Sequence, residues 1–212
     1  MNRRTVILAL ALLLGAIGAY ASWPRPADLR GFEPADIARL ETAMWRDYYD
    51  KRYVALFYHL YASTRTQFGF SPFRSLHIAL SAAEAARTFQ PTRSRQEADA
   101  ALPALVAYYR DFAPAAPAVF DVGEVARLEL DWWQARREAV SPDDYGLTIA
   151  RVAALTYGKG LDDSGLRQFG VARAEAMAFR DARGEGITEA DWATIETQLV
   201  GAYRSLKASV AR

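Results

Sequence analysis

The chain has 212 residues, which is enough for one domain with a well-buried core. Its 26 Lys and Arg residues nearly balance its 25 Asp and Glu residues, and the net charge of +1 excludes the strong positive field that nucleic-acid partners require. The sequence has no Cys, which excludes disulfide bonds and thiolate chemistry.

Residues 1–22 have the composition of a signal peptide or a single transmembrane anchor. Arg3 and Arg4 precede an uncharged apolar run, and Ala19-Tyr20-Ala21 has the small-x-small form that signal peptidase cleaves. The run is at the short end of the roughly 17 to 25 residues that span a bilayer, so cleavage and retention are both open. Because basic residues precede the run, we expect the rest of the chain outside the cytoplasmic membrane.

The signal and the abundance of Arg and Ala indicate a bacterial cell envelope. The domain is then expected in the periplasm, free if the leader is cleaved and held at the inner membrane if it is retained. The predicted partners are the membrane, through the N-terminal segment, and a protein of the envelope.

Residues 23–33 are predicted to form a linker, because Pro24 and Pro26 exclude a helix there. Residues 34–212 are predicted to form a single all-α extracytoplasmic domain, a bundle of about seven helices, because no stretch shows the alternation typical of a strand. Capping residues and helix breakers set the limits of the helices. They run from Pro34 to about Tyr61, from Ser71 to about Gln90, from Ser94 through a kink at Pro103, from Asp121 through Glu138, from Ser141 to Gly158, from about Ser164 to Asp181, and from Thr188 to about the C-terminus.

Aromatic and charged residues recur at heptad spacing along the first two predicted helices. The two stripes are Glu41, Trp45, Tyr48, Arg52, Ala55 and His59, and Phe73, His77, Leu80, Glu84 and Arg87. In an antiparallel hairpin centred near position 68, the stripes would form the seam between the two helices. This register predicts that Arg52 meets Glu84 and that His59 meets His77.

A short pattern repeats along the chain. Arg39-Leu40-Glu41 is followed after three residues by Trp45, and Arg127-Leu128-Glu129 is followed after three residues by Trp133. A looser copy, Arg173-Ala174-Glu175, lies in the sixth predicted helix. A glutamate and an arginine beside tryptophan on two helices predict a common polar interior.

This interior has two main interpretations. In the first, the ionic groups only fix the register of a bundle, and the protein is a non-catalytic binding or scaffold module. In the second, the residues form a pocket for an anionic or amphipathic small molecule. Arginines would bind its carboxylate or phosphate, aromatic rings would form apolar walls, and glutamates would orient the arginines. The candidate residues are Glu41, Trp45, Tyr48, Arg52, His59, His77, Glu84, Glu129, Trp133 and Arg136.

A third interpretation places a haem or a metal ion between His59 and His77, as part of an enzyme. Facing histidines at one level of a bundle could ligate either group, although the arginines nearby disfavour a cation. The sequence has only two His, and none of the spacings typical of metal-binding helices or nucleophile motifs is present. No resident cofactor, metal or catalytic residue is therefore predicted.

Overall fold

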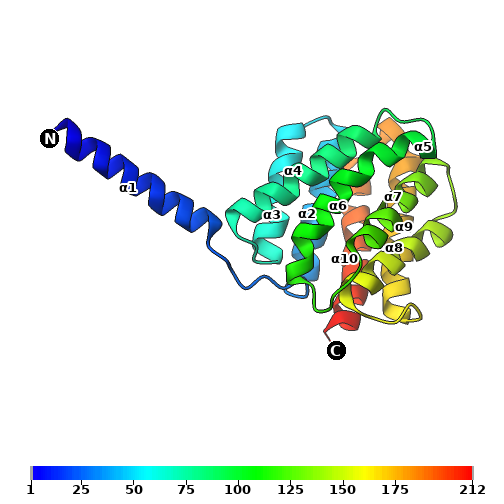
Figure 1. The fold of residues 1–212 in the computed structure, drawn as a ribbon. Helices are drawn as coiled ribbons and strands as arrows, with labels where there is room; N and C mark the ends of the chain where they lie inside the picture. The colour runs from blue at the N-terminus through cyan, green and yellow to red at the C-terminus, as the bar shows by residue number, and fades with distance from the viewer. Residues whose placement is uncertain (1, 212) are drawn as a thin grey trace.

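The computed structural model describes residues 2–211, and these residues form helices and no strand, which confirms the predicted all-α class. A separate N-terminal helix projects from a bundle in which nine α-helices are described, more than the predicted seven (Figure 1). The helices are α1 (Arg3–Ser22), α2 (Pro34–Tyr49), α3 (Tyr53–Gln67), α4 (Pro72–Phe89), α5 (Arg95–Ala98), α6 (Leu102–Phe112), α7 (Val122–Arg137), α8 (Pro142–Tyr157), α9 (Ser164–Arg183) and α10 (Glu189–Val210). Short 3-10 turns at Asp99–Ala101, Ala113–Ala115 and Gly184–Gly186 complete the fold.

Helix α1 is long and apolar enough to cross a membrane. It has 20 residues, its mean hydropathy reaches 2.1, and none of its residues is buried in the protein. A helix rises about 1.5 Å per residue, so these residues span about 30 Å, the thickness of the hydrocarbon core of a bilayer. A signal sequence has the same length and composition, and both forms of the N-terminal prediction stay open.

Most helices of the bundle begin where the sequence predicts them, because the signals at these points are local. Ser71 caps α4 by accepting a hydrogen bond from the backbone N–H of Arg74, and Asp121 caps α7 in the same way. Thr188 and Asp191 form a reciprocal capping box at the start of α10. Pro103 lies at the start of α6, where the predicted kink separates this helix from α5.

The predicted first helix is wrong in one respect, because it consists of two helices, α2 and α3. Lys51 has a positive φ of 57°, and the backbone N–H of Arg52 donates to the carbonyl of Asp47 at 2.8 Å. This 6→1 bond and the left-handed residue before it form a Schellman motif, which ends a helix. Glycine usually occupies the left-handed position. Because Lys51 occupies it here, the sequence does not indicate the break.

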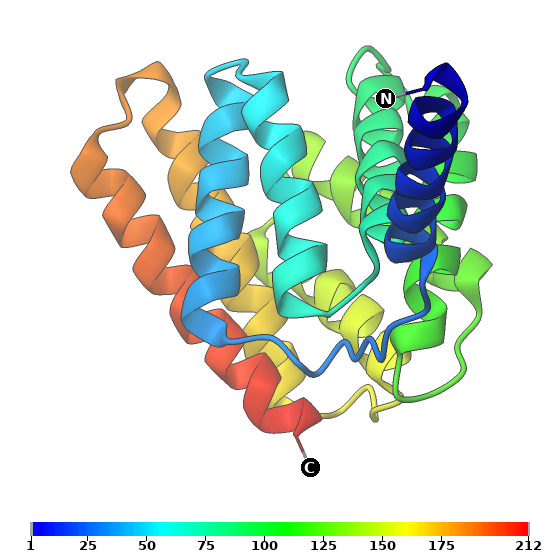
Figure 2. The same cartoon turned by 90° about the vertical axis from the view of Figure 1, so that its left-hand side faces the viewer.

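The eight longer helices of the bundle form a closed ring. Each of these eight helices packs against the one that follows it, in the order α2, α3, α4, α6, α7, α8, α9 and α10. The last of them, α10, packs against α2 and closes the ring. Figure 2 shows α10, α2, α3 and α4 side by side on one face of this ring. A ring of helices places one flank of every member toward a common axis, so residues far apart in the sequence face the same central space.

The second half of the predicted linker belongs to the core. Leu29 and Phe32 are 2% and 1% exposed, and the hydroxyl of Tyr157 donates to the carbonyl of Leu29 at 3.0 Å. Lys207 donates to the carbonyls of Arg30 and Phe32 at 2.7 and 2.8 Å. The segment runs across one end of the ring (Figure 2). It therefore connects α1 to the bundle and also closes that end.

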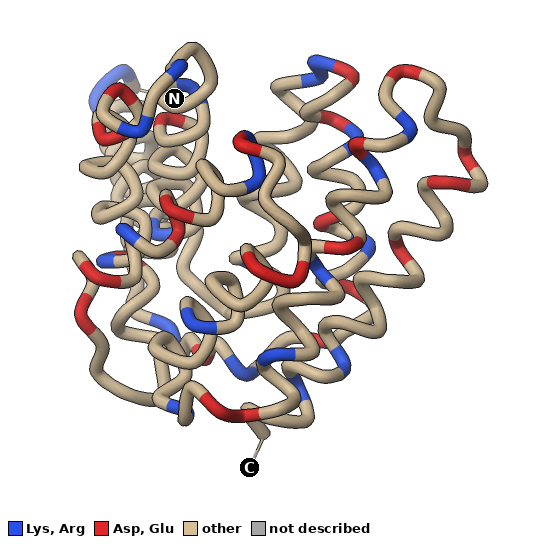
Figure 3. The backbone as a smooth tube through the Cα atoms, turned by 90° about the vertical axis from the view of Figure 1, so that its right-hand side faces the viewer, with Lys and Arg blue, Asp and Glu red and all other residues tan. Residues whose placement is uncertain are grey.

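Charged residues of both signs are interspersed along the helices (Figure 3). Several form ion pairs at the surface between neighbouring helices, such as Arg95 with Glu138 and Arg151 with Glu124. Pairs this exposed contribute about 1 kcal/mol or less each. The stability of the ring therefore rests mainly on its buried residues.

Candidate functional site

The ring encloses an elongated cavity of about 470 Å³. Protein interiors contain few voids larger than a water molecule, and this volume is within the range of small-molecule pockets. Every helix of the ring contributes to the wall. Examples are Glu41 of α2, Leu60 of α3, Ala83 of α4, Tyr108 of α6, Glu129 of α7, Tyr157 of α8, Arg173 of α9 and Tyr203 of α10.

One end of the cavity is closed and the other reaches the surface. At the closed end the ring of Phe68 lies 6.3 Å from that of Phe32 and 5.9 Å from that of Phe112, measured between centroids. At the other end Tyr48 is 38% exposed, which makes it the most exposed side chain of the lining. Helix α2 rises about 16 Å between Ile37 and Tyr48, both of which line the cavity. The site is therefore a deep pocket with its mouth beside Tyr48.

Helix α4 contributes an unusually small wall. Four of its six lining residues are alanines at helical spacing, namely Ala79, Ala82, Ala83 and Ala86, and the other two are Ile78 and Phe89. A core helix with leucine at these positions would fill much of the space that alanine leaves open. The cavity thus follows directly from the sequence of this helix.

The predicted seam of α4 faces the opposite way, so that prediction is wrong. Phe73 is 59% exposed, Leu80 is 51% exposed, and Glu84 and Arg87 form an ion pair with each other on the surface. The heptad pattern assigns the largest apolar side chains to the interior. In α4 the alanine face is the internal one, because it borders a cavity.

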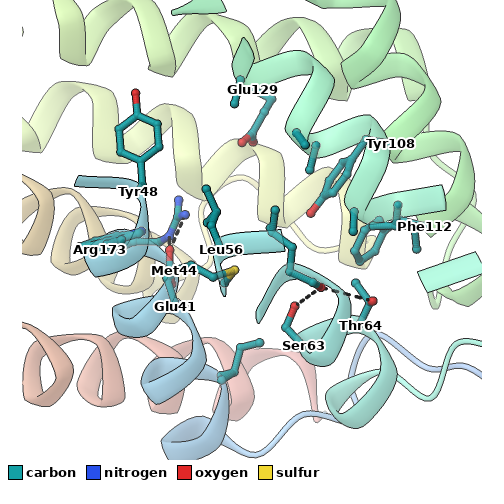
Figure 4. A pocket seen from close by; sticks show the side chains of 18 of the residues that line it. Glu41, Met44, Tyr48, Leu56, Ser63, Thr64, Tyr108, Phe112, Glu129 and Arg173 are labelled. Carbon is teal, nitrogen blue, oxygen red and sulfur yellow. Dashed lines mark hydrogen bonds and ion pairs between the residues drawn. The ribbon is translucent and has the colours of Figure 1, made fainter. Parts of the chain in front are cut away.

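A buried ion pair lies at the middle of the cavity wall. Nε and Nη2 of Arg173 donate to one oxygen of Glu41 at 2.8 and 2.6 Å, and the hydroxyl of Tyr203 donates to the other oxygen at 2.5 Å. Burial lowers the pKa of Arg173, but the Glu41 carboxylate more than offsets this effect, and the pKa is raised overall. Arg173 is therefore a permanent cation, and Figure 4 shows it beside Glu41.

A second carboxylate, Glu129, faces the same space from α7. One of its oxygens accepts from the hydroxyl of Tyr109 at 2.8 Å and the other from Nε1 of Trp133 at 3.1 Å. Both donors are neutral, and no basic group among residues 2–211 lies within the 4.0 Å of an ion pair with Glu129. Burial, followed by the charge of Glu129, raises the pKa of Tyr109 well above its ordinary value.

Tyr108 contributes a hydroxyl to the cavity that has no hydrogen-bond partner within the described part of the chain. Burial raises its pKa, and the carboxylate of Glu129 raises it further, whereas Arg173 lowers it. The hydroxyl therefore stays protonated and lies within electrostatic range of both polar clusters. Figure 4 shows Tyr108, Glu129 and the Arg173 pair around one central space.

Arg136 lies in the cavity wall but is already bound by the protein. Its Nε and Nη2 donate to the two oxygens of Asp181 at 3.0 and 2.9 Å, and Nη2 also donates to the hydroxyl of Tyr49 at 2.6 Å. This bidentate pairing occupies the edge of the guanidinium that a ligand carboxylate would use. Arg136 is therefore not free to bind an anionic ligand in the predicted way, because Asp181 and Tyr49 already occupy Nε and Nη2.

Arg52 and Glu84 do not meet, so their predicted pairing is wrong. Arg52 lies at the start of α3 and binds Asp47, with Nη2 to Oδ1 at 2.8 Å, and Asp50, at 3.2 Å. The break between α2 and α3 removes Arg52 from the stripe of Glu41. It joins two helices here instead of lining the cavity.

The predicted pairing of the two histidines is also wrong. Nδ1 of His59 lies 2.7 Å from the buried carboxylate of Asp47, and Nδ1 of His77 binds Asp111 of α6. Each imidazole is thus held by a carboxylate on a different helix. Residues 2–211 also contain no group of three or more His, Asp or Glu close enough to hold a metal ion.

The structure divides the predicted site residues into two sets. Those that line the cavity are Glu41, Trp45, Tyr48, Glu129, Trp133 and Arg136. Those outside it are Arg52, His59, His77 and Glu84. The repeated Arg-Leu-Glu pattern therefore identifies residues of one interior, whereas the hairpin register does not.

Comparison with known proteins assigns no family to this arrangement. No family model, no curated protein and no solved structure matches the chain. A function is therefore inferred from the residues of the cavity.

Three residues that shape the polar centre were missing from the predicted site: Tyr108, Arg173 and Tyr203. A sequence signal existed only for Arg173, which begins the looser third copy of the repeated pattern. Its partner Glu41 is 132 positions away in the chain, so the pair depends on the closure of the ring. The two tyrosines have no distinguishing spacing.

Proposed function

We propose that this protein is a binding module of the bacterial cell envelope that encloses an elongated, largely apolar molecule carrying one polar group. The observation that carries the proposal is the cavity, which every helix of the ring lines and which is mostly apolar, with a polar centre formed by Glu41, Arg173, Glu129 and Tyr108. Pockets with apolar walls and a few convergent polar groups are typical of small-molecule sites.

The apolar wall of the cavity favours binding over a purely structural role. Apolar surface that stays in contact with water forgoes about 25 cal/mol of stabilisation per Å². A bound apolar molecule covers this surface, whereas a scaffold gains nothing from leaving it uncovered.

Helix α1 supports the cell-envelope part of the proposal. With Arg3 and Arg4 before its apolar run, it would hold the bundle outside the cytoplasmic membrane, or direct its export. A module close to a bilayer has access to lipid-like molecules. The proposed ligand therefore has one apolar chain and one polar head group.

Native mass spectrometry of a shortened protein tests the proposal. Because none of the residues of α1 is buried, a protein that begins at Trp23 keeps every core residue and needs no detergent, which could itself fill the cavity. We expect a bound organic molecule of one chemical class to co-purify. Haem or a stoichiometric metal would support the enzyme interpretation instead, and an empty protein that binds no apolar probe would refute the proposal.

A pair of substitutions on neighbouring positions of α4 tests the location. Ala83→Trp places an indole in the cavity, whereas Glu84→Trp places the same indole on the exposed face. After removal of the native ligand, the protein should bind 1-aminoanthracene, an uncharged fluorescent probe. Ala83→Trp should abolish this binding and Glu84→Trp should preserve it. Equal binding by both variants would place the site elsewhere.

A further inference from the structure

The charges around the cavity restrict the head group of the ligand, and this inference rests on the proposed function. Four ionic side chains line it: Glu41 and Arg173, which pair with each other, Glu129, and Arg136. Arg136 is neutralised by Asp181, from outside the lining. The pairs cancel, so Glu129 leaves one uncompensated negative charge inside the cavity.

This charge disfavours an anionic ligand. A carboxylate or phosphate in the cavity would lie near Glu129, in an apolar surrounding that screens repulsion weakly. Arg173 cannot compensate for both anions, because Glu41 already binds it through two nitrogens. The arginine-bound acid of the sequence-based hypothesis therefore lacks a free cation within the described lining.

The polar centre still has unused hydrogen-bonding capacity of both kinds. A carboxylate has about four lone-pair sites, and Glu129 uses one on each oxygen. Nη1 of Arg173 and the hydroxyl of Tyr108 have no partner among residues 2–211 and border the cavity. The centre thus offers an acceptor on α7 and donors on α9 and α6. An ammonium group could donate to Glu129, but it has no acceptor and would leave the donors of Tyr108 and Arg173 without a partner.

We propose that the cavity selects an uncharged head group that both donates and accepts hydrogen bonds, as the hydroxyl of a long-chain alcohol or a monoacylglycerol does. Its O–H donates to Glu129, and its oxygen accepts from Tyr108 or Arg173. This arrangement satisfies polar atoms that the protein alone leaves without partners. The apolar chain then occupies the space along the alanine face of α4.

Displacement of 1-aminoanthracene by ligands with matched chains tests the head-group proposal. The shortened protein, freed of native ligand, is titrated at neutral pH with dodecanol, dodecanoic acid and dodecylamine. We expect dodecanol to bind at least about tenfold more tightly than the acid or the amine, because its hydroxyl alone both donates to Glu129 and accepts from Tyr108 or Arg173, and it carries no charge that burial would desolvate. Acid or amine binding as tight as that of the alcohol would overturn the head-group proposal and leave the proposed function intact.

Variants separate the role of Glu129 from general effects on the fold. Glu129→Gln removes the charge and should remove the discrimination against the acid, whereas Glu84→Gln, on the surface, should leave all three affinities unchanged. Tyr108→Phe should weaken dodecanol by a few fold and leave the probe unaffected. Unchanged discrimination in Glu129→Gln would overturn the assignment. Absence of probe binding to the unmodified protein would instead refute the proposed function itself.

Discussion

Small residues have opposite effects on packing in two parts of the ring, the contact between α8 and α9 in one half and the inner face of α4 in the other. Between α8 and α9, Gly146 and Gly170 bring the helices into backbone contact, because a Cβ atom at Gly170 would lie 2.1 Å from the carbonyl oxygen of Gly146. In α4, Ala82 and Ala83 line the cavity. The same loss of side-chain volume thus gives close packing in one half and open space in the other. What lies opposite the small residue decides the outcome.

The largest expected effect tests the ion pair between the two halves. Arg173→Ala leaves Glu41, which is 3% exposed, without its cation, and breaking a buried pair in this way costs about 3 to 5 kcal/mol. Chemical denaturation should show this loss in the free energy of unfolding. The control Arg95→Ala removes an exposed pair and should cost about 1 kcal/mol or less. Similar losses in both variants would show that the Glu41 pair is not buried as described.

The next effect tests the close packing of α8 and α9. Gly170→Ala forces a methyl group against backbone atoms and should lower the free energy of unfolding by about 1 to 3 kcal/mol. Gly201→Ala is the matched control, because this glycine of α10 has no atom within 4 Å of its would-be Cβ. It should raise stability by about 0.5 to 1 kcal/mol, as expected for glycine within a helix. Thermal melts that rank the two variants in the reverse order would contradict the packing contrast.

A smaller effect is expected when an alanine is replaced by leucine, and the change in stability should have opposite signs in α4 and in α8. Ala82→Leu adds apolar volume inside the cavity and should stabilise the ligand-free protein by about 1 kcal/mol or more. Ala154→Leu, at a residue of α8 that is 1% exposed and does not line the cavity, should destabilise it by overpacking. Denaturant titration of both proteins measures the difference. A loss of stability in both would indicate that α4 has no free space beside it.

The smallest effect concerns how the helices begin. Hydrogen bonds from the hydroxyl and backbone N–H of Thr188, and then one from Arg183, lower the pKa of Asp191 to about 2 from 3.8. A lowered pKa stabilises the fold above the unfolded value, and this contribution disappears as pH falls from about 4 to 2. Melting temperatures of the natural protein and Asp191→Asn should therefore converge over this range. Parallel curves would show that the capping box at α10 is not formed.

The other half of the ring has a helix start of a different kind. Helix α3 follows Arg52 and has no side-chain cap, and its partners come from α2 and the α2–α3 turn through Asp47 and Asp50. Its N-terminus therefore depends on a tertiary contact, whereas α10 caps itself. Local opening near the cavity mouth should accordingly be easier at α3 than at α10.

Local signals allowed most of the fold to be predicted from the sequence. The caps at Ser71, Asp121 and Thr188 act within three or four residues, and the structure places helix starts at each of them. The break at Lys51 escaped prediction because a lysine holds the left-handed conformation that glycine usually signals. The break accounts for one of the two helices beyond the predicted seven, and the separation of α5 from α6 accounts for the other. The break also removes Arg52 from Glu84, whereas His59 and His77 do not meet because each binds a carboxylate of another helix.

The candidate site could be predicted only in part, because its geometry depends on closure of the ring. The repeated pattern located Glu41 and Glu129, whose internal position follows from their spacing relative to tryptophan. The pattern could not predict that Arg173 is the partner of Glu41. Arg173 approaches Glu41 only because α9 packs against α10 and α10 packs against α2. Hydrophobic periodicity also gives little weight to alanine as a core residue. It therefore assigned the wrong face of α4 to the interior.

The linker couples helix α1 to the inner end of the pocket. Phe32 closes the inner end of the cavity, and only the few residues from Trp23 separate this stretch from the end of α1. A protein shortened to begin at Pro34 would lose that closure as well as the tether. A pull on α1 would act on the segment held by Tyr157 and Lys207, and through it on the floor of the cavity.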